Sequence, residues 1–199
     1  MNIKFRHELI NYLIQQYNLK NYLEIGIDDG SNYNKIICVN KVSVDPAIGQ
    51  YSHAKPTYRM TSDEFFETKS KECEPFDIVF IDGLHHSDQV DKDIANSISN
   101  LSDGGFIILH DCNPLRKEEQ IIPRNKSGRW NGDVWKSVVR FRNSPSKLGC
   151  VVLNTDEGLG IISNRISKNK KFKYNLEYEF LEQNRKECLG LLESINSII

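Results

Sequence analysis

The chain lacks a basic excess, a long apolar segment and any paired cysteine motif. Its 199 residues include 26 Lys and Arg against 27 Asp and Glu, which leaves a formal net charge of −1. This balance argues against binding to a nucleic-acid backbone, which normally requires a surplus of positive charge. The longest apolar runs, such as Phe106 to Leu109, are far shorter than the roughly 18 residues that cross a bilayer. We therefore expect no nucleic-acid partner and no membrane segment.

The cysteines and the first residues predict an intracellular protein. The five cysteines are scattered, odd in number and free of C-x-x-C pairs, which argues against a disulfide framework or a structural zinc site. Most of them read as small buried apolar residues. The segment Met1 to Glu8 lacks the apolar region of a secretory signal, which predicts a cytoplasmic location. A content of 39% hydrophobic and 27% charged residues is typical of a soluble globular domain.

Short apolar runs alternate with segments in which apolar residues recur at helical spacing. This pattern is typical of βαβ units around a parallel sheet. Helices are predicted at 9–17, 31–39, from about 62, 90–101, 131–142 and 176–198. Strands are predicted at 22–27, 41–44, 57–60, 76–81, 106–109, 150–153 and 159–163, with 103–105 as a turn and 114–129 as a long loop. The prediction is an α/β fold with a seven-stranded mixed sheet, five parallel strands followed by an antiparallel hairpin, flanked by helices. Residues 1–199 would form one domain, with an N-terminal helix in 1–20, a core in 21–165 and a C-terminal helix in 174–199.

The segment Y-L-E-I-G-I-D-D-G-S-N-Y, residues 22–33, predicts a ligand-binding turn between a strand and a helix. Gly26 and Gly30 allow a sharp turn and let a ligand lie against bare main chain. The spacing is not G-x-G-x-x-G, because Asp28 stands at the second glycine position, and an acidic loop would repel a pyrophosphate. A cationic or zwitterionic ligand fits better. Asp45 ends the second predicted strand, where a carboxylate can bind both hydroxyls of a ribose.

The segments V-S-V-D-P, F-D-I-V-F-I-D-G and L-S-D-G-G-F-I-I-L-H-D follow the glycine motif in order. Over residues 20–165 the chain thereby resembles the class I S-adenosylmethionine-dependent methyltransferases. The resemblance implies a Rossmann-like methyltransferase fold with S-adenosylmethionine as cofactor. It assigns Glu24, Gly26 and Gly30 to the methionine part of the cofactor and Asp45 to the ribose. The remaining residues assigned to the cofactor, mostly near the adenine, are Pro46, Thr61, Ser62 and Asp82.

Polar residues follow the fourth and fifth predicted strands, at the edge where the transferred methyl group would lie. Because methyl transfer from a sulfonium is an in-line displacement, the protein must orient the acceptor and help to remove its proton. One group follows the fourth strand and precedes a helix, and the other ends the fifth strand. The candidate catalytic residues are Asp82, His85, His86, His110 and Asp111.

These residues allow two mechanisms. In the first, which we prefer from the sequence, Asp82, His110 and Asp111 hold Mg²⁺ or another divalent cation that lowers the pKa of the acceptor oxygen. This set resembles the metal site of catechol-type and macrocin-type O-methyltransferases, but a histidine replaces one of their acidic or amide ligands. A softer ion such as Mn²⁺ or Fe²⁺ is therefore an alternative. In the second mechanism no metal is bound, and His85, His86 or His110 removes the acceptor proton.

The segment R-W-N-G-D-V-W-K, residues 129–136, predicts either a wall over the acceptor or a core helix. In the first interpretation Trp130 and Trp135 cover the acceptor. In the second, Trp135 packs in the core and Asp133 caps its own helix. Together with H-D-C-N-P, the segment resembles a methyltransferase branch associated with sugar and surface-polysaccharide tailoring. Basic residues in the preceding loop indicate either a solvated loop, which we prefer from the sequence, or an anionic acceptor such as a phosphorylated sugar; they are Lys117, Arg124, Lys126 and Arg129.

The predicted function is therefore methyl transfer from S-adenosylmethionine to an oxygen of a small molecule, a sugar or a sugar-linked group. One alternative is methylation of RNA or protein, which the net charge and the lack of an N-P-P-Y-like segment disfavour. The other is a catalytically silent cofactor-binding scaffold, which would not need so many polar residues at the strand ends. The apolar C-terminal sequence I-N-S-I-I is compatible with a monomer or a homodimer.

Overall fold

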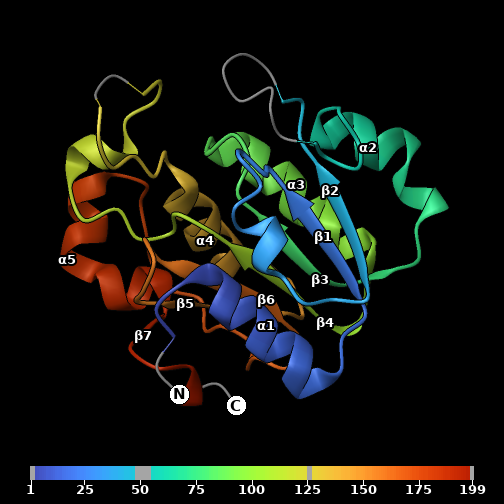
Figure 1. The fold of residues 1–199 in the computed structure, drawn as a ribbon. Coiled ribbons are helices and arrows are strands. Elements are labelled where there is room, and N and C mark those ends of the chain that lie inside the picture. Colours follow the sequence, from blue (N-terminus) through green and yellow to red (C-terminus); the bar gives the residue numbers. More distant parts are fainter. Residues whose placement is uncertain (1–2, 48–54, 125–126, 198–199) are drawn as a thin grey trace.

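A computed structural model describes residues 3–47, 55–124 and 127–197. Its sheet has seven strands in the order β2-β1-β3-β4-β6-β5-β7 (Figure 1). The strands are β1 (Asn21–Ile25), β2 (Asn40–Val44), β3 (Phe76–Ile81), β4 (Leu101–Leu109), β5 (Gly149–Leu153), β6 (Leu159–Ser163) and β7 (Leu191–Leu192). Strands β1 to β4 are parallel, β6 is antiparallel to β4 and β5, and β7 is parallel to β5.

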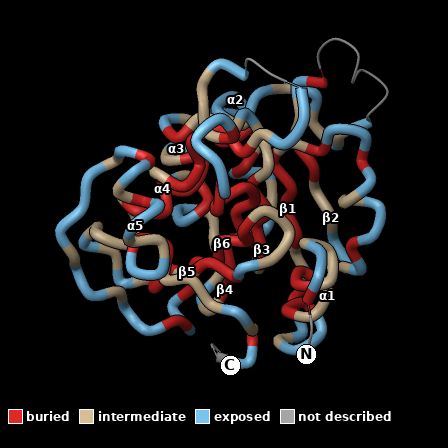
Figure 2. Tube along the Cα trace, turned by 90° about the vertical axis from the view of Figure 1, so that its left-hand side faces the viewer, coloured by how far each residue is buried: buried red, intermediate tan, exposed pale blue. Residues whose placement is uncertain are grey.

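Helices cover both faces of this sheet (Figure 1). One face packs against α2 (Ser62–Thr68), α3 (Ser87–Ser99), α4 (Val134–Asn143) and α5 (Tyr178–Leu189), and the other against α1 (Arg6–Tyr17). The 3-10 turns are η1 (Tyr33–Lys35), η3 (Ser70–Glu72), η4 (Lys117–Gln120) and η5 (Ile195–Ser197). Figure 2 shows the buried residues concentrated in the central strands. Because these strands are covered on both faces, their sequences are continuous apolar runs.

The predicted fold class is confirmed. The structure has a mixed seven-stranded sheet, parallel at first and then antiparallel, flanked by helices. The strand predicted at 76–81 coincides with β3, and the hairpin of β5 and β6 corresponds to the strands predicted at 150–153 and 159–163. None of the helices in the described part of the chain has the length and apolar character needed to span a bilayer.

The helix predicted at 31–39 is wrong, because this stretch contains only the 3-10 turn η1. The N–H of Ser31 donates to Oδ1 of Asp29 at 2.8 Å, which favours a local turn over a helix. Ile37 and Val39 are 78% and 73% exposed, so the stretch has no continuous apolar face to bury.

Three strand predictions also differ from the structure. Residues 57–60 form only a single bridge between Val44 and Tyr58, which leaves four parallel strands instead of five. The predicted turn at 103–105 lies within β4, where the pairing with β3 shifts register. The seventh strand comes from Leu191–Leu192, which the sequence placed in the C-terminal helix, because α5 ends at Leu189.

Candidate active site

The carboxyl ends of the parallel strands open into a cavity of about 760 Å³. Its wall contains most of the predicted site residues, namely Gly26, Asp45, Pro46, Thr61, Ser62, Asp82, His85, His110 and Asp111. Glu24 lines a neighbouring cavity of about 240 Å³. Gly30 and His86 line neither; the N–H of Gly30 closes a turn onto the carbonyl of Ile27, and His86 is the N-terminal cap residue of α3.

The turn after β1 is built around Gly26 and Asp45. Gly26 has a φ of 81°, and a Cβ there would lie 2.3 Å from the carbonyl oxygen of Asp82, so only glycine fits. The carboxylate of Asp45 accepts hydrogen bonds from the N–H groups of Ile27 at 2.8 Å and Ala47 at 2.5 Å. Because each carboxylate oxygen has a second lone pair, Asp45 can still accept from a ligand in the cavity.

Glu24 is a buried carboxyl next to this turn. The hydroxyl of Tyr22 and the Nδ2 of Asn32 both donate to its Oε2, the latter at 3.2 Å. Burial raises the pKa of Glu24 to about 7, although the two hydrogen bonds act in the opposite direction. The group therefore titrates near neutral pH, at the wall of the smaller cavity.

Glu24→Gln is expected to make the protein more stable than the wild type at high pH. The folded-state pKa of Glu24 lies above the unfolded one, so its stabilising contribution is complete below about pH 4.5 and is lost as the pH rises through about 7. That shift corresponds to about 3 kcal/mol. Urea unfolding at pH 4.5 and pH 8 measures it, with exposed Glu67→Gln as the control. An equal difference from wild type at both pH values would contradict the assignment.

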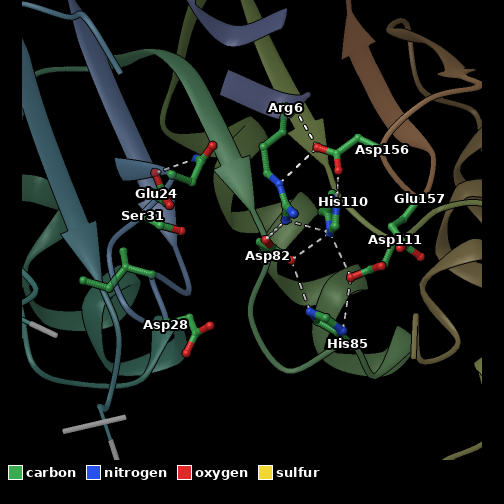
Figure 3. Close-up of polar contacts among 12 residues, drawn as sticks. Arg6, Glu24, Asp28, Ser31, Asp82, His85, His110, Asp111, Asp156 and Glu157 are labelled. Atoms are coloured by element: carbon green, nitrogen blue, oxygen red, sulfur yellow. Dashed lines mark hydrogen bonds and ion pairs between the residues drawn. The ribbon is translucent and has the colours of Figure 1, made fainter. Parts of the chain in front are cut away.

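Two histidines lie between two aspartates at the ends of β3 and β4 (Figure 3). Oδ1 of Asp82 is 3.2 Å from Nε2 of His85 and 3.2 Å from Nδ1 of His110. Oδ2 of Asp111 is 3.3 Å from Nδ1 of His85 and 2.9 Å from Nδ1 of His110. Each imidazole thus contacts both carboxylates. Four of the five predicted catalytic residues therefore meet in one cluster, namely Asp82, His85, His110 and Asp111. The fifth, His86, is not part of it.

Opposite charges govern the titration of this cluster. Burial lowers the pKa of His110, but the charge of Asp82 and the hydrogen bonds with Asp111 and Asp156 outweigh it and raise the pKa to about 12. The pKa of His85 is also raised, by its hydrogen bond to Asp82 and the charge of Asp111, against the effect of burial. His110 therefore stays an imidazolium at neutral pH and cannot accept a proton, whereas His85 can act as a base only in its deprotonated form, which its raised pKa disfavours.

Arg6, at the first position of α1, is a member of the site that the sequence analysis missed. Its Nη1 donates to Oδ2 of Asp82 at 2.8 Å and lies 3.1 Å from Nδ1 of His110. Its Nε and its backbone N–H both donate to Oδ2 of Asp156, at 3.1 and 2.7 Å. Asp156 belongs to the turn between β5 and β6, and it was missed as well. Since 150 positions separate Arg6 from Asp156, no local pattern could have paired them.

Residues 129–133 contact the cluster of histidines and aspartates. The ring of Trp130 stacks on His85, with centroids 5.2 Å apart and planes at 19°. Nδ2 of Asn131 donates to Oδ1 of Asp111 at 2.7 Å. A Cβ at Gly132, whose φ is 59°, would lie 2.0 Å from the carbonyl oxygen of His85, so only glycine allows this close approach. Trp130 also lines the cavity, as the wall interpretation predicted.

The wall interpretation is wrong for Trp135, whose side chain is wholly buried and packs in the core. The predicted capping role of Asp133 is also wrong in its target. Asp133 makes no side-chain hydrogen bond to the N–H groups of its own helix α4, although its Oδ2 pairs with Lys136 at 3.1 Å. Its Oδ1 accepts from the N–H of Ser87, the first residue of α3, at 2.6 Å. The carboxylate therefore joins the starts of two helices that lie next to the site.

None of the described basic residues predicted in the 114–129 loop lines the cavity, although Arg129 pairs with Glu157, a residue of its wall. Arg129 donates to Glu157 at 2.6 Å, Lys117 pairs with Glu179, and Arg124 donates to the carbonyl of Gly128 at 2.7 Å. Lys126 lies outside the described residues. The cavity wall is instead rich in carboxylates; beyond Asp45, Asp82 and Asp111 it includes Asp28, Asp63, Asp93, Asp156 and Glu157.

Three metal-capable side chains of the described residues converge, namely Asp82, His85 and Asp111, whose ligand atoms lie within 4.8 Å of one another. Two carboxylates and an imidazole suit a divalent transition metal by type. Their surroundings do not fit one, because the guanidinium of Arg6 is hydrogen-bonded to Asp82 and would repel a second cation there. The predicted set with His110 does not fit either, because Arg6 lies against the very nitrogen that would bind the ion. We assign no catalytic step to a metal.

Comparisons with known proteins agree with this fold. A family model described as a methyltransferase domain matches residues 23–112, which run from β1 to just beyond β4. A solved structure of a Staphylococcus aureus protein, provisionally assigned as a caffeoyl-CoA O-methyltransferase, has a TM-score of 0.59 at 22% identity and covers 81% of this chain and 85% of its own. A Bacillus cereus O-methyltransferase crystallised with S-adenosylhomocysteine (SAH) has a TM-score of 0.55 at 14% identity, with coverages of 79% and 80%.

The methyltransferase MycE of the mycinamycin biosynthetic pathway, crystallised with Mg and SAH, is similar over 86% of this chain and 50% of its own. Its TM-score is 0.51 at 15% identity. No protein with a curated description matches the chain at a significant level. At these identities the structural similarities establish the fold alone, a Rossmann-like methyltransferase fold.

Proposed function

We propose that this protein transfers a methyl group from S-adenosylmethionine to an oxygen of a small molecule. The observation that carries the proposal is one cavity that joins the turn of Gly26 and Asp45 to the cluster of His85 and Asp111. The methyltransferase-domain match spans both parts. The volume of about 760 Å³ lies within the roughly 300–1,000 Å³ typical of ligand sites. The acidic wall suits the positive charge of a sulfonium.

The residues around the turn fit the cofactor. Asp45 would accept hydrogen bonds from the ribose hydroxyls, and Glu24, in the smaller cavity, would accept from the methionine ammonium. Because Gly26 has no side chain, the cofactor could lie directly against the main chain there. The adenine would lie against Pro46, Thr61 and Ser62. When bound, S-adenosylmethionine supplies an electrophilic methyl group.

His85 acts as the general base in this proposal. It lines the cavity, its Nε2 is hydrogen-bonded to Asp82, and its Nδ1, 3.3 Å from Asp111, makes no hydrogen bond. As the acceptor oxygen attacks the methyl group, its proton would pass to Nδ1 of deprotonated His85, and the two carboxylates would stabilise the imidazolium that forms. Trp130 holds the plane of the His85 ring by stacking on it.

We further propose a sugar or sugar-linked acceptor. Trp130 lies at the cavity wall together with Asp156 and Glu157. An aromatic face beside carboxylates suits a polyhydroxylated ring, because C–H groups can pack on the aromatic ring while hydroxyls donate to the carboxylates. A phosphate on the acceptor stays a prediction; among the basic loop residues, Arg129 contacts a residue of the wall, Glu157, and is paired with it. A cytoplasmic location and a monomeric or homodimeric state stay predictions.

The direct test is a transfer assay with methyl-labelled S-adenosylmethionine. We expect mass spectrometry to show a methylated small molecule when the protein is incubated with a panel of sugars and nucleotide-linked sugars. Label transferred only to RNA or protein would contradict the acceptor class. A protein that binds neither S-adenosylmethionine nor S-adenosylhomocysteine in calorimetry would contradict the whole proposal.

Asp45→Ala is expected to weaken S-adenosylmethionine binding by about 1.5–3 kcal/mol, the usual contribution of hydrogen bonds to a charged group. Titration calorimetry measures the affinity. Asp28→Asn is the matched control, because it removes one carboxylate from the same turn and asparagine tolerates the positive φ of 46° at that position. An affinity equal to that of wild type would mean that Asp45 does not hold the ribose.

A further inference from the structure

The N-terminal helix supplies a permanent cation to the carboxylates of the site. The guanidinium of Arg6 lies between Asp82, at the end of β3, and Asp156, in the turn between β5 and β6 (Figure 3). The side chains of Arg6, Asp82 and Asp156 are 29%, 18% and 11% exposed. Partly buried pairs of this kind are screened by solvent far less than surface ion pairs. Arginine also presents a planar, always charged fork that suits two carboxylates at once.

Arg6 contacts two of the three residues of the predicted metal site, Asp82 and His110. Its Nη1 donates to Oδ2 of Asp82 at 2.8 Å and lies 3.1 Å from Nδ1 of His110. A metal ion bound to that nitrogen at about 2.1 Å would be no more than roughly 5 Å from the guanidinium. At such a separation, in a partly buried site, the two positive charges repel strongly. Arg6 and a divalent ion therefore compete for the same carboxylates.

Positive groups already contact each carboxylate of the cluster. The carboxylates of Asp82, Asp111 and Asp156 are in contact with Arg6 and with the two imidazoles described above. In a metal-dependent site, the cation neutralises the carboxylates and fixes their orientation. Arg6 can perform both tasks here, because its two hydrogen-bonded nitrogens fix Asp82 and Asp156 relative to each other.

We propose that Arg6 is a positioning residue that takes the place of a divalent cation, so that this site excludes metal ions while Arg6 is present. By holding Asp82, Arg6 keeps His85 in place as the proton acceptor. The consequence for turnover rests on the proposed methyltransferase function. The exclusion of metal ions does not, because it can be measured without any reaction.

The first experiment measures Mn²⁺ binding by electron paramagnetic resonance. We expect no binding by wild type, and none by Lys4→Ala, which removes an exposed cation two positions away. Arg6→Ala is expected to bind Mn²⁺ at least about tenfold more tightly than wild type, since its carboxylates lose their cation. Adding Asp82→Asn to Arg6→Ala is expected to abolish this gain. Should Arg6→Ala fail to fold, Arg6→Lys, which keeps the charge, is expected to exclude Mn²⁺ as wild type does.

Two results would overturn the proposal: wild-type binding of Mn²⁺ that Asp82→Asn abolishes, or no gain of binding in folded Arg6→Ala. The second experiment measures turnover. We expect wild type to keep its rate after exhaustive chelation, and Arg6→Ala to lose kcat at least about tenfold with KM for S-adenosylmethionine changed less than about threefold. Arg6→Lys should restore part of kcat. Loss of wild-type activity on chelation would overturn the proposal, whereas expected Mn²⁺ results without any methyl transfer would overturn only the proposed function.

Discussion

Asp111→Asn is expected to lower kcat by about 10²–10⁴-fold and to leave the affinity for S-adenosylmethionine unchanged within about threefold. Oδ2 of Asp111 faces Nδ1 of His85 at 3.3 Å, whereas its Oδ1 accepts from Asn131 at 2.7 Å. Asparagine has nearly the same shape and tolerates the φ of 60° at this position. It lacks the charge that orients His85 and stabilises its protonated form. The large effect is therefore expected from electrostatics and not from a change of fold.

Steady-state kinetics and calorimetry on the same preparation check this expectation. Asp103→Asn is the matched control, because it makes the same chemical change at an exposed position of β4. An unimpaired kcat in Asp111→Asn would remove Asp111 from the mechanism. A parallel loss of cofactor affinity would instead assign it to binding.

Gly26→Ala is expected to abolish measurable S-adenosylmethionine binding and to destabilise the protein far more than Gly30→Ala. Both glycines have left-handed backbone, with φ of 81° and 79°, which costs an alanine roughly 1–2 kcal/mol. At Gly26 a Cβ would also collide with the backbone, 2.3 Å from the carbonyl oxygen of Asp82. At Gly30 its nearest neighbour is the flexible side chain of Asn34, at 3.5 Å. The collision would displace Asp82, whose backbone lies against Gly26 and whose carboxylate contacts the two histidines.

Chemical denaturation and titration calorimetry on the two variants measure the difference. Gly30→Ala introduces the same backbone strain. The additional loss of unfolding free energy in Gly26→Ala therefore measures the contact between the turn and the end of β3. We expect that excess to be at least about 2 kcal/mol in unfolding free energy, the cost of a severe steric clash. Equal losses of unfolding free energy in the two variants would show that the backbone near Gly26 and Asp82 can move apart to accommodate a Cβ.

The fold class and most of the site could be predicted from local patterns. Apolar runs marked the buried strands, and the polar residues that follow them had to meet at one edge, because parallel strands end on the same side of the sheet. Asp45, Asp82, His85, His110 and Asp111 therefore reach one cavity, as expected. His86, next to His85, does not, because it lies at the start of α3. One position in the sequence is enough to turn a side chain away from a site.

By itself, the sequence determined the fold class, the glycine turn and the carboxylates and histidines at the strand ends, since each depends on neighbours within a few residues. Tertiary structure alone decided how those groups are neutralised and oriented. Arg6 reaches Asp156 across 150 positions, Trp130 stacks on His85, and Asp133 caps a helix other than its own. Such contacts produce no periodic pattern in the sequence. They join segments that come together only when the sheet forms and α1 and α4 pack against it. For the same reason, whether the carboxylates meet a metal ion or an arginine was decided in three dimensions.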